Sequence, residues 1–115
     1  MKTKAPGVEA CKKILSPTAV AVLVSMPVLV ETEWVLRSRY GLSREAVLGV
    51  LRAALEAREL SFEDEPALEE ALFQWKDSAC GFSDCLIAAH NRQLGCRATA
   101  TFDVKAARLP GTIPV

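Results

Sequence analysis

The chain has 115 residues, half of them hydrophobic, and its 14 basic residues balance its 14 acidic ones. A chain of this length can bury one hydrophobic core, so we expect residues 1–115 to form a single domain. The apolar content excludes a disordered chain, and the zero formal net charge excludes a general electrostatic attraction to nucleic acid or to an anionic membrane.

In the first half of the chain, helical and strand patterns alternate. Pro27 suits the first turn of a helix, and Ser43 suits the N-cap of the next one. The apolar face expected for this second helix consists of Val47, Leu48, Leu51, Ala54 and Leu55. The elements predicted here are a helix over residues 8–15, a strand over 19–25, helices over 27–40 and 43–58, and a strand over 60–62.

The second half continues the alternation. Pro66 opens a helix that turns Leu68, Leu72 and Trp75 inward, and Gly95 is expected to end the next helix, over residues 82–94. A strand in "ATATF", a short helix and an edge strand in "GTIPV" complete the prediction. Helices that alternate with buried strands predict an α/β fold, a parallel sheet with helices on both faces.

Neither a membrane segment nor an export signal is expected. The longest apolar run, residues 19–30, contains Ser25 and Pro27 and is shorter than the roughly 20 residues of a spanning helix. The basic N-terminus lacks the apolar segment that a signal peptide needs. We therefore expect a soluble, cytoplasmic protein with no membrane partner.

The spacing of the cysteines and of the single histidine does not favour a metal site. Cys11, Cys80, Cys85 and Cys96 form no CxxC pair, and the cytosol keeps thiols reduced, so they are interpreted as small core residues. His90 follows Cys85 by five residues, which turns it away around a helix, and it is expected to be a lone surface imidazole. A zinc-binding or thiol-redox module remains an alternative.

Three acids follow predicted strands, where ligands of open α/β sheets bind. Glu31 has no cation three or four residues away along its helix, whereas Glu33 has Arg37 and is expected to form a surface ion pair. Burial of an unpaired carboxylate requires a partner, often a metal ion. Glu31 is therefore a candidate ligand, although it could simply reach solvent at the edge of the helix.

The other two acids also allow two interpretations. Asp84 has no cation within one helical turn, but an aspartate in a first turn is favoured by the helix dipole alone. Asp103 could be a turn or N-cap residue. Taken together, Glu31, Asp84 and Asp103 end three successive β/α units on one expected edge of the sheet, which is how a site for a hard cation is assembled.

The segments "VLVETEWVLRSRYGLSRE", "FSDCLIAAHNRQLGC" and "TFDVKAARLPG" resemble those of PIN-domain proteins, especially the VapC-type toxins of toxin–antitoxin operons. In that family an acidic quartet holds Mg²⁺ or Mn²⁺ for endoribonucleolytic cleavage. By motif, the resemblance assigns catalytic and metal-binding roles to Glu31, Asp84 and Asp103. It also implies an RNA substrate, a homodimer and a cognate antitoxin that covers the acidic site.

Two departures from the family pattern affect the expected activity. PIN domains begin with a central strand that ends in an aspartate, and no such stretch precedes residue 8; Gly81 stands where many relatives carry another acid. The expectation is a PIN-like sheet without its first, central strand and a nuclease impaired by lost carboxylates. The alternative is a non-catalytic PIN remnant that acts through antitoxin binding or self-association.

Overall fold

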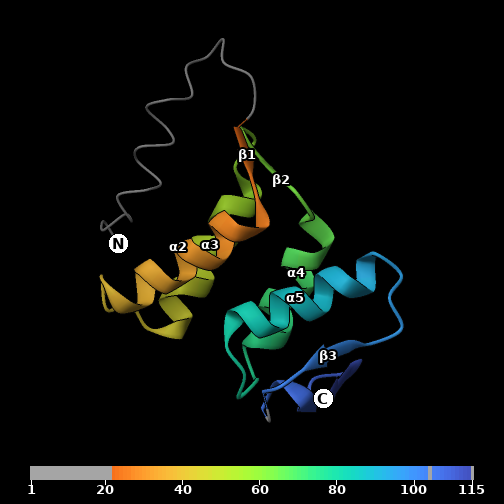
Figure 1. Cartoon of the computed structure of the whole chain (residues 1–115). Helices are drawn as coiled ribbons and strands as arrows, with labels where there is room; N and C mark the ends of the chain where they lie inside the picture. Colours follow the sequence, from red (N-terminus) through yellow and green to blue (C-terminus); the bar gives the residue numbers. More distant parts are fainter. Residues whose placement is uncertain (1–21, 104, 115) are drawn as a thin grey trace. The chain divides into compact units, whose positions relative to one another are not determined.

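The computed structural model describes residues 22–103 and 105–114 (Figure 1). The predicted helix over residues 8–15, the beginning of the predicted strand over 19–25, and Cys11 lie outside the described residues. The chain divides into two compact units, Met1–Glu63 and Asp64–Val115, and each unit is described by itself. The expectation of a single domain over the whole chain stays a prediction.

The first unit contains two helices between two strands. Its elements are β1 (Val22–Val24), α2 (Met26–Ser38), α3 (Arg44–Glu56) and β2 (Leu60–Phe62). Strand β1 pairs with β2 in parallel, with Val22 opposite Leu60. Parallel neighbours require a crossover connection, and here helices α2 and α3 supply it.

Local signals explain where these helices begin. A proline lies in the first turn of α2, and the Ser43 hydroxyl accepts a hydrogen bond of 3.2 Å from the Ala46 amide at the start of α3. Of the apolar face predicted for α3, Val47, Leu48 and Leu51 are buried, while the remaining two residues are half-buried. The capping and packing predictions for this helix are confirmed.

The second unit consists of two helices followed by two short strands. Its elements are α4 (Glu65–Trp75), α5 (Phe82–Gln93), β3 (Thr99–Thr101), the 3₁₀ turn η1 (Ala106–Arg108) and β4 (Thr112–Pro114). Strands β3 and β4 are parallel, with Thr99 opposite Thr112. The predicted edge strand in "GTIPV" is therefore confirmed, and η1 lies in the connection that leads to it.

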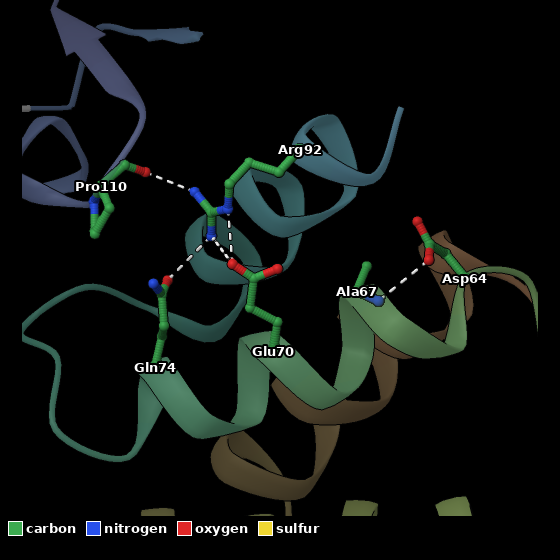
Figure 2. Close-up of polar contacts among 6 residues, drawn as sticks. All are labelled: Asp64, Ala67, Glu70, Gln74, Arg92 and Pro110. Atoms are coloured by element: carbon green, nitrogen blue, oxygen red, sulfur yellow. Dashed lines mark hydrogen bonds and ion pairs between the residues drawn. The ribbon is translucent and has the colours of Figure 1, made fainter. Parts of the chain in front are cut away.

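Helices α4 and α5 pack against each other in the core of this unit. Leu68, Leu72 and Trp75 are all buried, as predicted, and the Trp75 and Phe82 rings meet edge to face with centroids 5.4 Å apart. The Asp64 carboxylate caps α4 by accepting a hydrogen bond of 3.1 Å from the Ala67 amide (Figure 2). Burial of each large apolar side chain contributes about 1.5–3 kcal/mol, which makes this helix pair a firm support for the strands.

The α/β class with parallel strands is confirmed. Among the described residues the strands form two separate pairs, β1–β2 and β3–β4, and strands β1 and β3 are not hydrogen-bonded neighbours. Each pair lies within one unit. In the described part of the chain, no helix has both the length and the apolarity that crossing a membrane demands.

Candidate functional site

Asp84 lies in the first turn of α5, at the edge of a hollow in the second unit. The hollow has a volume of about 120 Å³, enough for several water molecules. Its walls come from α5, β3, β4 and η1, and its lining residues are Asp84, Ile87, Ala88, Thr99, Ala100, Thr101, Ala106 and Thr112. Asp84 is the one ionisable residue in this lining, and its side chain is half-buried.

The surroundings of Asp84 disfavour its negative charge. Burial raises the pKa of the Asp84 carboxyl above its ordinary value, and the negative charge of Asp103 raises it further, while a backbone hydrogen bond at Gly81 acts in the opposite direction. Asp84 forms no ion pair with any residue of the described part of the chain. The site therefore brings two carboxylates within electrostatic reach, and no ion pair with a cation of residues 22–103 or 105–114 compensates them.

Asp103 follows β3 and is exposed, and its carboxylate organises the turn into η1. Its Oδ1 accepts hydrogen bonds from the amides of Lys105 (2.8 Å) and Ala106 (3.1 Å). The buried Cys80 thiol donates to the Lys105 carbonyl oxygen at 2.8 Å and ties the same turn to the segment before α5. Asp103 is thus a turn residue, and the N-cap position of η1 itself is Lys105. The turn keeps the Asp103 carboxylate close enough for its charge to act on Asp84.

Glu31 belongs to the first unit, on α2, and its side chain is exposed. Within the described residues it has no hydrogen bond or ion pair, as its sequence neighbours suggested. An exposed carboxylate needs no compensating partner, so the burial argument made for Glu31 does not apply. Its place in a metal site stays a prediction that rests on the family motif.

Glu33, two residues further along the helix, is the buried acid of α2. Its side chain is only 5% exposed and accepts a 2.7 Å hydrogen bond from Nε of Arg37. This hydrogen bond, together with the charge of Glu33, raises the pKa of the Arg37 guanidinium. The predicted pair with Arg37 is confirmed, but the prediction that it lies on the surface was wrong for its acidic member.

The histidine and cysteine predictions need two corrections. His90 is not a lone imidazole, because its Nδ1 lies 2.6 Å from Oδ2 of Asp64 across the α4–α5 pair. Cys80 and Cys85 are buried as expected, whereas Cys96 is exposed. The described residues contain no group of three or more histidine, cysteine or acidic side chains that could hold a metal ion.

Thr112, a further residue at the hollow, was not found from the sequence, whereas Gly81, next to the hollow, was noted there as a departure from the family pattern. The hydroxyl oxygen of Thr112 is buried and has no hydrogen-bond partner among the described residues. Gly81 is the N-cap residue of α5, and a Cβ placed on it would lie 3.9 Å from Oδ2 of Asp84. The alternation of "GTI" could have indicated Thr112, because it places the threonine on the face opposite Ile113.

The donor set of the hollow is chemically suited to a hard divalent cation. Such cations prefer oxygen ligands, which Asp84 and the Thr112 hydroxyl provide in the lining. Asp103 lies outside the lining but close enough for its charge to act on Asp84. A cation there would also offset the repulsion between the two carboxylates. Two acids in one unit are a small ligand set, so the site is suited to weak rather than tight binding.

Comparison with protein families matches residues 3–111, nearly the whole chain, to the PIN domain. The comparisons with curated proteins and with solved structures gave no match. PIN domains are a nuclease-type family whose members generally use divalent metals. The match agrees with the α/β fold and the parallel strands. The chain belongs to the PIN domain family.

Proposed function

We propose that this chain is a VapC-like PIN domain, a Mg²⁺- or Mn²⁺-dependent endoribonuclease of the toxin type whose activity is weakened in this form. The observation that carries the proposal is the pair Asp84 and Asp103: a half-buried carboxylate whose pKa is raised by burial and by a second carboxylate. Such a pair fits a site that is completed by a cation from outside the protein.

Each acid would have a defined task. Asp84 and Asp103 would hold the cation, and the family motif assigns the same role to Glu31 as a third carboxylate. A bound divalent ion would lower the pKa of a water molecule and stabilise negative charge on the phosphate of RNA. The first turn of α5 and the hydrogen-bonded turn at Asp103 would keep the two carboxylates in place while an RNA strand binds.

The number of carboxylates supports weak activity. Affinity in hard-cation sites follows ligand number and charge, and this chain offers three family-type acids where the family uses four. The described residues bring two of them together. Binding of Mn²⁺ and cleavage of RNA are therefore expected at a low level.

A non-catalytic role through protein contacts is the second candidate. The Phe102 side chain, directly before Asp103, is 90% exposed, and Ile113 on the neighbouring strand is 51% exposed. Exposed aromatic and aliphatic side chains beside an acidic site suit a protein partner, such as an antitoxin segment or a second copy of the chain. Homodimer formation belongs to the same proposal.

Cleavage of RNA with and without Mn²⁺ tests the proposal. The chain itself, its Asp84→Asn variant and a form extended at the N-terminus by a strand ending in aspartate are compared on the same RNA. Asp77→Asn, which changes an exposed acid between α4 and α5, is the matched control. We expect little cleavage by the chain and strong cleavage by the extended form. Asp84→Asn should abolish cleavage by either form, whereas Asp77→Asn should abolish neither.

Other outcomes would change the conclusion in specific ways. Strong cutting by the 115-residue chain that Asp84→Asn abolishes would show that three carboxylates suffice and would contradict the weakened activity. An inert extended form would favour the non-catalytic role. Cleavage that is unchanged in Asp84→Asn would show that Asp84 is not part of the catalytic site.

A further inference from the structure

Arg92, in the last turn of α5, connects three parts of the second unit (Figure 2). Its Nε donates a 2.7 Å hydrogen bond to Oε2 of Glu70 on α4, and its Nη2 contacts Gln74 one turn further along that helix. Its Nη1 donates a 2.6 Å hydrogen bond to the Pro110 carbonyl oxygen, in the turn before β4. The planar guanidinium suits this role because its donors point in several fixed directions.

The turn that Arg92 holds determines how β4 meets β3. Gly111 has a φ of +78°, and a Cβ placed on it would lie 3.3 Å from Nη1 of Arg92. The Gly111 carbonyl oxygen in turn accepts a 2.8 Å hydrogen bond from the Thr99 amide, the first residue of β3. The register that follows places Thr99 opposite Thr112.

This register places Thr112 in the lining of the hollow, which Asp84 also lines. Thr112 lines the hollow, and its buried hydroxyl has no partner in the described residues. The hydroxyl of Thr99, by contrast, receives a 2.9 Å hydrogen bond from the Asn91 amide group. Arg92 does not line the hollow, so its contact with Pro110 can act on the site only through the turn and β4.

We propose that Arg92 is a positioning residue for the candidate site: by binding the Pro110 carbonyl, its guanidinium holds β4 on β3 and keeps Thr112 at the hollow beside Asp84. The proposal deepens the proposed function and rests on it for the identity of the ligand. An ion pair with Glu70 alone would stabilise the α4–α5 pair but would not require a bond to a neutral carbonyl.

The test separates these two roles of Arg92. Arg92→Gln and Arg92→Lys both remove the fork that spans Glu70 and Pro110, and the lysine variant keeps the charge if the glutamine variant fails to fold. Glu70→Gln removes the ion pair but leaves an acceptor for Arg92 and leaves the Pro110 contact intact. Arg97→Gln, at an exposed position, controls for the loss of one positive charge.

Two measurements are made on the whole chain: hydrogen exchange of the Thr99 amide and the affinity for Mn²⁺ by water proton relaxation. We expect both Arg92 variants to speed Thr99 exchange on the order of tenfold and to weaken Mn²⁺ binding about tenfold, as supporting residues of metal sites do. Glu70→Gln and Arg97→Gln should change neither by more than about twofold.

Equal effects of Arg92→Gln and Glu70→Gln on both measurements would overturn the positioning role, because the ion pair alone would then explain them. Unchanged Thr99 exchange in both Arg92 variants would overturn it as well. Absence of Mn²⁺ binding by the unaltered chain would instead contradict the proposed function, since the Thr99 amide reports on the Arg92 contact without any metal.

Discussion

Glu33 and Asp84 are both shielded from water, but their charged neighbours have opposite signs. Glu33 on α2 is buried, and Arg37 four residues later supplies a cation at 2.7 Å. Asp84 on α5 is half-buried, and the nearby charge that acts on it is a second carboxylate, Asp103. The first acid is compensated within its own helix, which is typical of a structural ion pair. The second is not, which is typical of a site that binds a cation.

The largest expected difference between the two acids is in metal binding. Asp84→Asn and Asp103→Asn should each lower the affinity for Mn²⁺ about tenfold to a hundredfold, because each removes one charged ligand from a small set. Glu33→Gln should leave the affinity unchanged. Titration calorimetry or water proton relaxation measures this. Equal losses in all three variants would erase the distinction between a structural and a functional acid.

Removal of the Arg37 side chain should reveal the structural role of Glu33. Arg37→Ala leaves a buried carboxylate without its donor, so we expect a loss of about 1–3 kcal/mol in the free energy of unfolding. The double variant Glu33→Gln and Arg37→Ala should recover part of this loss, because the buried charge is gone. Urea denaturation followed by circular dichroism gives the values. A loss below about 0.5 kcal/mol would mean that Glu33 is solvated without Arg37.

An added acidic side chain beside Asp84 should increase the affinity of this site for Mn²⁺. Gly81→Asp starts a new side chain 3.9 Å from Oδ2 of Asp84, at the position where the resemblance to PIN domains implies another acid. We expect Mn²⁺ to bind more tightly, on the order of tenfold, since affinity follows the number of charged ligands. Gly49→Asp, on an exposed position of α3, is the matched control. Weaker binding by Gly81→Asp would place the cation elsewhere.

The smallest expected effect is a pH dependence of stability. The raised pKa of Asp84 means that the folded state holds its proton more firmly than the unfolded state, whose aspartate titrates near about pH 4. The stability from this proton is complete below about pH 4 and is lost as pH rises through the raised folded-state value. Without divalent ions, Asp84→Asn should therefore gain stability relative to the unaltered chain between acid and neutral pH.

Denaturation at several pH values in the presence of a chelator measures this difference, with Asp77→Asn as the control at an exposed acid. Added Mn²⁺ should then stabilise the unaltered chain and not Asp84→Asn, because a ligand stabilises the state that binds it. If Asp84→Asn instead becomes less stable than the unaltered chain as the pH rises toward neutral, the Asp84 charge is favoured in the folded state.

The sequence alone determined the features that depend on a few neighbouring residues. Ser43 caps α3, a proline lies in the first turn of α4, and the Asp103 carboxylate binds the amides of the turn into η1. Each of these features depends on residues at most three positions apart. The Glu33–Arg37 pair likewise follows from helical spacing. The α/β class was also accessible, because strand and helix patterns alternate along the chain. The family was accessible from the resemblance of three segments to PIN-domain proteins.

Tertiary structure decided which faces are buried and which distant groups meet. Spacing along α2 could not show that Glu33 is buried and Glu31 exposed, because that depends on what packs against the helix. The contacts of His90 with Asp64 and of Arg92 with Pro110 join residues 26 and 18 positions apart. Side chains so far apart in sequence meet only after the chain has folded, so no local pattern records them.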